Sequence, residues 1–266
     1  MKAIFLNTWG GKVFEPLVRF LRESAPTTDF FCLQEIFDSP YARTVSWGGH
    51  ADIWKQLSAA LGDFEPYYAP AVSGFDGDMT ADFDLSFGNA IFAKNNIPIG
   101  AHGQFFICGE DRAASPVNEM FPHVLQYVRF AREGKEYTLA NLHGIAYPGT
   151  KRDTPERIVQ SQRALDFLKG EKGKKILGGD FNLMPDTESI RMIEAAGMRN
   201  LIKEFGITTT RSTISYAQYP ESDRQYFADY AFVSPGTAVT KFTVPQILIS
   251  DHLPLIVEIA EEKRKG

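Results

Sequence analysis

The sequence lacks the long apolar runs that membrane helices need, because no stretch approaches about 18 uninterrupted apolar residues. The apolar run at the N-terminus is too short for the hydrophobic core of a secretory signal and is typical instead of a strand. The chain also has only two cysteines, Cys32 and Cys108, which do not form a disulfide framework. These absences predict a protein of the reducing cytoplasm with no membrane span.

Basic residues are also scarce. The chain has 28 Lys and Arg residues against 33 Asp and Glu residues, and its formal net charge is -5 at pH 7. Proteins that hold long tracts of duplex DNA usually carry a basic face, since much of their affinity comes from neutralised phosphates. A local basic patch would still be enough for nucleic acid, but the acidic balance disfavours nonspecific duplex binding and favours a small or single-ended phosphate substrate.

Nothing in the sequence divides the chain, which has no internal repeat, no low-complexity segment and no Pro/Gly/Ser-rich linker. We expect one domain over residues 1–260 and a charged tail over residues 261–266. Helical patterns alternate with short apolar runs, which indicates a mixed α/β protein. Residues 71–87 and 98–122 are expected to be loop or irregular structure. The expected helices begin near Phe14, Ile53, Pro155 and Asp186, and the expected strands cover residues 2–6, 29–36, 88–93, 124–130, 137–142, 175–177, 230–233, 238–244 and 254–260.

Polar residues of the kinds that bind metals or move protons lie next to these strands. A strand end can present such groups to a cleft without burying them unpaired inside the sheet. Taken one at a time, each has an ordinary structural explanation, such as a turn residue or a solvated strand end. The residues in question are Asn7, Glu35, His143, Asp180, Asn182, Asp229, Asp251 and His252.

Taken together, five ordered segments around these residues resemble one known superfamily. The segments are Leu6-Asn7-Thr8-Trp9, Leu33-Gln34-Glu35, Gly179-Asp180-Phe181-Asn182, residues 227–235 and Ser250-Asp251-His252-Leu253-Pro254-Leu255. They resemble the endonuclease/exonuclease/phosphatase superfamily, which includes deoxyribonuclease I, the exonuclease III-type abasic endonucleases and the tyrosyl-DNA phosphodiesterases. The resemblance covers essentially the whole chain. It implies a deoxyribonuclease I-like α+β fold, a four-layer α/β/β/α sandwich with helices on both outer faces.

The resemblance also implies an enzyme, a metal-dependent hydrolase of phosphate esters. Mg²⁺, or Mn²⁺ in its place, takes oxygen ligands and keeps several waters, so one or two carboxylates are enough. We expect Glu35 to be the principal metal ligand, with Asn7 and Asp251 nearby. The ion would neutralise the phosphate and stabilise the leaving oxygen.

The same resemblance gives catalytic roles to five other residues. Asp180 is expected to orient or deprotonate the attacking water, while Asn182 holds that water or a phosphate oxygen. Asp229 is expected to orient His252, whose cation would suit an anionic transition state. His143 stands where deoxyribonuclease I-like members place a second catalytic histidine.

Two further residues are candidates for substrate contacts. Arg157 follows His143 in an arrangement similar to that of the tyrosyl-DNA phosphodiesterases, and its guanidinium would fork onto a phosphate. A solvated helix face explains Arg157 equally well. Asn89 in Gly88-Asn89-Ala90 would support the metal site, although a strand-end turn is the alternative.

The favoured activity is that of a phosphodiesterase or nuclease acting on nucleic acid ends or nucleotides. Abasic endonucleases carry no histidine at the position of His143, so an abasic-site repair enzyme is not expected. Two alternatives stay open: a phosphatase of a small sugar or lipid phosphate, and a non-catalytic binding module on the same fold. A monomer is the default expectation.

Overall fold

The structure is a computed structural model, and it describes residues 1–76, 80–109 and 122–260. One of its two mixed sheets contains β1 (Lys2–Asn7), β2 (Phe30–Asp38), β3 (Phe64–Ser73), β4 (Ser86–Lys94), β11 (Val239–Thr243) and β12 (Leu255–Ile259). The six strands have the order β11-β12-β1-β2-β4-β3. The pair β1–β2 is parallel and the other neighbouring pairs are antiparallel.

The second six-stranded sheet is assembled in the same way. It contains β5 (Ile99–Cys108), β6 (His123–Arg132), β7 (Lys135–His143), β8 (Lys174–Asp180), β9 (Arg199–Asn200) and β10 (Asp229–Val233). Their order is β5-β6-β7-β8-β10-β9, with β7 and β8 parallel at the centre. Each sheet thus has a parallel pair of strands whose carboxyl ends share one edge.

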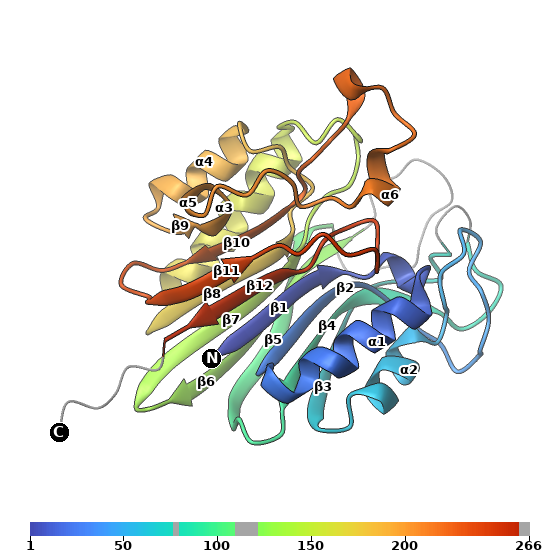
Figure 1. Cartoon of the computed structure of the whole chain (residues 1–266), viewed down its shortest axis with the longest axis horizontal. Helices are drawn as coiled ribbons and strands as arrows, with labels where there is room; N and C mark the ends of the chain where they lie inside the picture. The colour runs from blue at the N-terminus through green and yellow to red at the C-terminus, as the bar shows by residue number, and fades with distance from the viewer. Residues whose placement is uncertain (77–79, 110–121, 261–266) are drawn as a thin grey trace.

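Helices cover the outer face of each sheet, as Figure 1 shows. Leu17 of α1 and Ile53 of α2 belong to the same buried cluster as Ile4 and Phe31 of the first sheet. On the other side, Leu168 of α3 and Ile190 of α4 share a cluster with the second sheet. This arrangement confirms the four-layer α/β/β/α architecture. The helices are α1 (Phe14–Ser24), α2 (Ile53–Ala60), α3 (Pro155–Gly170), α4 (Glu188–Ala195), α5 (Leu201–Glu204) and α6 (Thr213–Tyr216), with 3-10 turns at Trp9–Gly11, Ala25–Thr27 and Glu221–Asp223.

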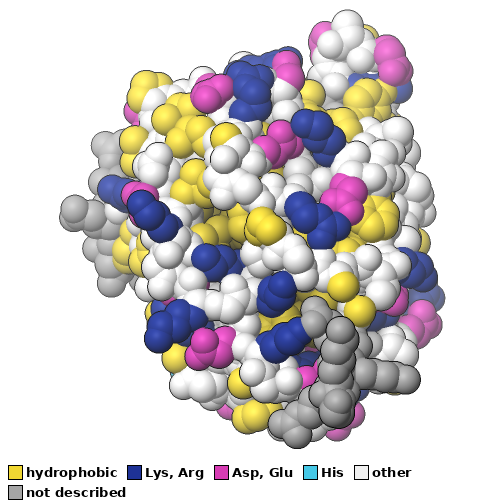
Figure 2. All heavy atoms as spheres, turned by 90° about the vertical axis from the view of Figure 1, so that its left-hand side faces the viewer, with side chains coloured by type: hydrophobic (Ala, Val, Ile, Leu, Met, Phe, Trp, Pro, Cys, Tyr) yellow, Lys and Arg dark blue, Asp and Glu magenta, His cyan; other side chains and the backbone are white. Residues whose placement is uncertain are grey.

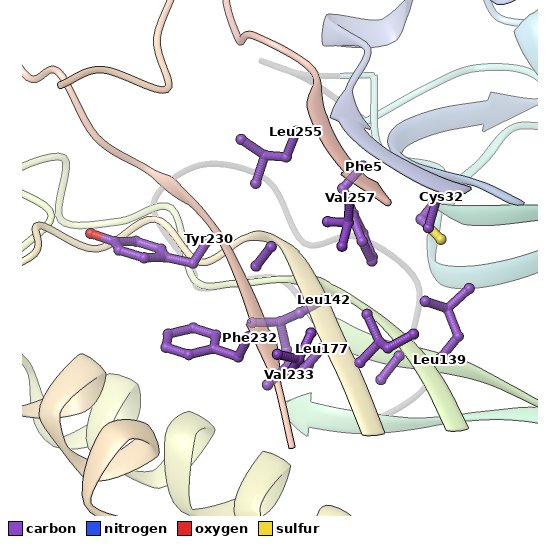
Figure 3. Close-up of a cluster of buried hydrophobic side chains, with 14 of the residues drawn as sticks. Phe5, Cys32, Leu139, Leu142, Leu177, Tyr230, Phe232, Val233, Leu255 and Val257 are labelled. Atoms are coloured by element: carbon purple, nitrogen blue, oxygen red, sulfur yellow. The ribbon is translucent and has the colours of Figure 1, made fainter. Parts of the chain in front are cut away.

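The two sheets meet through side chains that alternate along each strand. Phe5, Cys32 and Val257 of the first sheet lie opposite Leu139 of the second (Figure 3), and all four are buried. Gly178 on β8 makes room for the Phe5 ring, because a Cβ there would lie 2.8 Å from the ring carbons. Residues two positions further along these strands therefore also face the space between the sheets.

The structure corrects the sequence-based prediction at β3, at the start of β4 and at β5. Residues 71–73 and 86–87, predicted as loop, belong to β3 and β4, and residues 99–108, predicted as irregular, form β5. β3 carries Pro66 and Pro70, which are tolerated because it is the outermost strand of its sheet. β5 is likewise outermost and contains two glycines, so neither strand has the alternating pattern of a central strand. Residues 110–121 of the predicted irregular stretch lie outside the described residues.

Figure 2 views the molecule from the left of Figure 1, where β1 begins. Lys and Arg side chains mingle there with Asp and Glu side chains, and no histidine is visible on this face. The candidate site lies at the other ends of β1 and β8. No helix among the described residues is long and apolar enough to cross a membrane.

The contact between the sheets predicts one stability effect. Phe5→Ala removes a ring that is 1% exposed and leaves a cavity against Gly178, so the free energy of unfolding should fall by about 3–5 kcal/mol. Denaturant unfolding measures this change. Tyr147→Ala is the control, because Tyr147 is 71% exposed and its truncation should cost less than about 0.5 kcal/mol. Equal losses in the two variants would contradict the packing described here.

Candidate active site

Strand alternation brings three of the predicted residues to one end of the space between the sheets. Asn7 lies two positions after Phe5 on β1, and Asp180 lies two positions after Gly178 on β8. His143 ends β7 and pairs in register with Asp180. All three side chains are buried, with exposed fractions of 0% for Asn7, 1% for Asp180 and 4% for His143.

Glu35 reaches this group through a β-bulge. Gln34 and Glu35 together oppose the single residue Asn89 of β4, and Glu35 has a left-handed φ of 58°. Regular alternation would turn Glu35 to the same face as Leu33, under the helices. The bulge instead directs its carboxylate toward Asn7 and His143, with Glu35 Oε1 3.8 Å from His143 Nε2.

Asn7 links the two sheets. Its Nδ2 donates to Glu35 Oε1 at 2.9 Å and to Asp180 Oδ2 at 3.0 Å. Its Oδ1 accepts from the backbone N–H of Trp9 at 2.9 Å, which fixes the orientation of the amide. Asn7 therefore presents its amide N–H groups to the two carboxylates and orients them. Its amide oxygen, the atom expected near a metal ion, accepts from Trp9 instead.

His252 lies between two aspartates of the second sheet. Its Nδ1 is 2.9 Å from both carboxylate oxygens of Asp229, and its Nε2 is 3.6 Å from Asp180 Oδ2. Burial and Arg211 oppose a charge on His252, but Asp229, Asp251 and Asp180 outweigh them and raise its pKa. The carboxylate of Asp229 thus sets the ring orientation and leaves Nε2 facing Asp180.

Asp180 is held ionised by its surroundings. Burial alone would raise the pKa of Asp180, but His252, Lys151, His143 and Arg211 together hold it well below its usual range. The backbone N–H of Asn182 donates to Asp180 Oδ1 at 2.8 Å. A carboxylate that is held in this way can orient a water molecule and accept a proton as charge develops.

Two cations that the sequence analysis did not single out also reach this site. Lys151 Nζ donates to Asn182 Oδ1, and Lys151 is 8% exposed. Arg211 Nη1 contacts His252 Nε2, and Arg211 Nη2 donates to Asp251 Oδ2 at 2.8 Å. Both residues lie outside regular strands and helices, so no strand-end pattern marked them.

A metal ion fits the acidic part of the site. Glu35, His143 and Asp180 offer ligand atoms that all lie within 4.8 Å of one another. Burial and the charge of Asp251 raise the pKa of Glu35 to about 7, so the carboxylates are crowded enough to need a compensating cation. Among the described residues, Asp251 belongs to neither of the two groups with this ligand spacing.

His143 is uncharged at neutral pH, because burial lowers its pKa to about 4. Its ring packs edge-on against His123 of β6, with centroids 5.3 Å apart. Burial also lowers the pKa of His123. His143 therefore lies beside Glu35 and Asp180 as a neutral imidazole.

Asn89 is buried between the sheets rather than exposed to a substrate. Its Nδ2 donates to the carbonyls of Val124 at 3.2 Å and Asn141 at 3.5 Å, and its exposed fraction is 1%. Asn141 in turn bonds to Gln34 Nε2 and to the carbonyl of Leu33. Asn89 thus belongs to a polar network that joins the sheets behind the site and lies opposite the bulge at Glu35.

The position of Arg157 does not fit the predicted contact with substrate. Its side chain is 0% exposed, and it donates at 2.6–3.2 Å to the carbonyls of Ile145, Ala146, Pro148 and Arg152. Each of its three guanidinium nitrogens donates to at least one of these carbonyls, so the group is directed at the backbone of this loop. The alternative of a solvated helix face is also wrong, because Arg157 points inward from α3 and fastens the loop that carries Lys151.

The chain is similar to a known protein family in its sequence. The sequence model described as Endonuclease/Exonuclease/phosphatase family matches residues 4–252. No curated protein matches the chain in sequence.

Solved structures share the fold at low sequence identity. A mannosyl-6-phosphatase from Bacteroides thetaiotaomicron has 18% identity and a TM-score of 0.71, with 98% of this chain and 100% of that chain covered. An endonuclease/exonuclease/phosphatase family protein from Leptotrichia buccalis has 17% identity, a TM-score of 0.71 and coverages of 98% and 100%. A humanised TDP2 of D. rerio has 15% identity, a TM-score of 0.65 and coverages of 98% and 99%. At these identities the likeness shows the fold alone.

The contacts of Arg157 predict a structural role. Arg157→Met removes the donors to four backbone carbonyls, that of buried Ile145 among them, and should lower the free energy of unfolding by about 3 kcal/mol or more. Thermal or denaturant unfolding measures the loss, and Arg191→Met on the exposed face of α4 is the control. A variant that keeps its stability but binds substrate more weakly would instead support the role predicted from the sequence.

Proposed function

Because the chain belongs to the Endonuclease/Exonuclease/phosphatase family, we propose that the site at the strand ends hydrolyses phosphate esters with the help of a divalent metal ion. The observation that carries the proposal is the alignment of Asp229, His252 and Asp180 beside the acidic group at Glu35. In this proposal a histidine donor, a carboxylate base and a cation site surround one point.

Glu35 is the proposed main metal ligand, with Asp180 and Asp251 close to it. Oxygen ligands of this kind suit Mg²⁺ or Mn²⁺. When bound, the ion would neutralise charge on the phosphate and on the leaving oxygen. Asn7 contributes by holding the carboxylates of Glu35 and Asp180 in place through its two hydrogen bonds.

The remaining residues act on the water and the phosphate. Asp180, kept ionised by its neighbours, orients the attacking water and accepts its proton. His252 is held by Asp229 and donates from Nε2 to a phosphate oxygen as negative charge develops there. Asn182 bonds to Asp180 through its backbone and fixes the loop that follows β8.

Two substrate classes fit this chemistry. The sequence analysis favours a phosphodiester at a nucleic acid end or in a nucleotide. A phosphate monoester, such as a sugar phosphate, is the second candidate, and the presence of Lys151 and Arg211 beside Asp180 and His252 favours it. The resemblance in fold to a mannosyl-6-phosphatase is in keeping with this second candidate.

Hydrolysis of a substrate panel tests the reaction. With Mg²⁺ or Mn²⁺, the wild type should cleave at least one member of a panel of monoesters, diesters, nucleic acids and sugar phosphates. Asp180→Asn and His252→Ala should each reduce turnover by about 100-fold or more, because they remove the base and the donor. Asp166→Asn on the exposed face of α3 is the control and should leave turnover unchanged.

Metal binding is testable without any substrate. Saturating Mg²⁺ should raise the melting temperature of the wild type by about 5–10 °C, since binding to the folded state contributes about 2–3 kcal/mol. Glu35→Gln should abolish most of that rise, while Glu136→Gln, at an exposed position of β7, should keep it. A wild type that shows neither turnover nor a metal-induced shift would favour the binding-module alternative.

A further inference from the structure

We propose that Asn141 is a positioning residue for the metal site, because it holds the β-bulge that turns Glu35 toward the reaction. Asn141 lies on β7 in the second sheet, whereas the bulge lies on β2 in the first. The inference rests on the proposed function, in which Glu35 is the main metal ligand. It assigns the alignment of that ligand to a neutral amide from the opposite sheet.

Asn141 contacts the first sheet at three points around the bulge. Its Nδ2 donates to the carbonyl of Leu33 at 3.1 Å and to the carbonyl of Ala90 at 3.3 Å, and its Oδ1 accepts from Gln34 Nε2. Leu33 and Ala90 are the last partners in regular register before the bulge, and Gln34 is the first residue inside it. One side chain therefore bridges both strands at the point where their regular pairing stops.

The core requires a bulge in β2 but does not fix the direction of each side chain within it. Leu33 and Ile36 both pack in the cluster under the helices, so the two residues between them depart from regular alternation. Gln34 and Glu35 must therefore share the inner side of the strand. Glu35 takes a left-handed φ of 58°, which is strained for a residue with a side chain, and Gln34 is held by Asn141. The Asn141 amide thus decides which of the two side chains points to the metal position.

The same contact relates Glu35 to the second sheet. Asn141 and His143 lie two positions apart on β7, so both side chains face the space between the sheets. Asn141 bonds to the residue before Glu35, while His143 Nε2 lies 3.8 Å from Glu35 Oε1. His143 in turn pairs in register with Asp180 on β8. The spacing of Glu35, His143 and Asp180 therefore depends on the hold that β7 has on the bulge.

Hydrogen-bond donors are scarce around the bulge. Among the described residues, the side-chain oxygens Gln34 Oε1 and Asn89 Oδ1 are buried and have no donor. Without Asn141, Gln34 Nε2 would also lose an acceptor, which leaves it the carbonyl of Cys32. The Gln34 side chain would then turn to pair its unsatisfied atoms, and the movement would carry the neighbouring Glu35 with it.

Manganese binding to the full chain tests the positioning role without a substrate. Asn141→Leu replaces the amide by an apolar group of similar size and should weaken Mn²⁺ binding, measured by electron paramagnetic resonance, by about 10-fold or more. Gln126→Met is the matched control. Gln126 is the buried partner of Asn141 on β6, but its Nε2 bonds to the carbonyl of Tyr67 on β3 and not to the bulge. This variant should lose stability as Asn141→Leu does and bind Mn²⁺ like the wild type.

Hydrogen–deuterium exchange of the metal-free chain tests the hold on the bulge by itself. The backbone amides of residues 33–36 should exchange about 10-fold faster or more in Asn141→Leu, because the bulge loses its contact with the second sheet. In Gln126→Met they should keep the rate of the wild type. If Asn141→Leu does not fold, Gln34→Met removes the same bond from the other side and should show both effects.

Two results would overturn the inference. One is Mn²⁺ affinity that stays unchanged in Asn141→Leu. The other is an equal loss of affinity in Asn141→Leu and Gln126→Met, which would leave Asn141 a general structural role. If the wild type binds no Mn²⁺, the proposed function fails. Faster exchange in Asn141→Leu would then still support the hold on the bulge, and unchanged exchange would overturn the inference as well.

Discussion

The bond from Asn7 to Asp180 joins the two sheets at the point where the chemistry is expected. Asn7 belongs to the first sheet and Asp180 to the second, and the same amide nitrogen also bonds to Glu35. Two buried carboxylates at this junction repel one another, and burial penalises both. The amide of Asn7 and the cations around Asp180 offset that repulsion. The packing of the sheets and the geometry of the site therefore depend on the same contact.

Period-two alternation explains how much of the site could be predicted from sequence. Asn7, His143 and Asp180 continue the inward faces of central strands, so residue type and strand end together indicated their position. Glu35 was found through resemblance, since the bulge that turns it inward leaves no mark in the hydrophobic pattern. Lys151 and Arg211 lie on loops and meet residues 31 and 41 positions away, a separation at which no local pattern is informative. The edge strands that contain proline or glycine were missed because they lack the alternating pattern by which a strand is predicted from sequence. The cytoplasmic location, the single domain and the monomeric state stay predictions.

Arg157 shows that residue type and sequence spacing alone do not establish a contact with substrate. Its guanidinium lies in the interior, where backbone carbonyls of one loop replace water as acceptors. Burying this charge is tolerable because each guanidinium nitrogen donates to a carbonyl. The result is a braced loop of residues 145–152, which ends at the buried ammonium of Lys151 and its partner Asn182. A cation that the sequence analysis assigned to substrate contact thus braces the loop that carries a second buried cation, Lys151.

The residues proposed for the reaction lie on strands or are held by strand residues, whereas the two cations beside them lie on loops. Glu35, Asp180 and Asp229 lie on strands of the two sheets, where ladder hydrogen bonds and the packed core fix them, and Asp229 in turn holds His252. Lys151 and Arg211 lie on connecting segments that can vary without disturbing the core. Family membership is therefore informative about the reaction, because the residues proposed for it are fixed by the strands that make up the shared fold. Solved relatives share this fold at only 15–18% identity over the chain, so the two sheets are retained although most side chains differ.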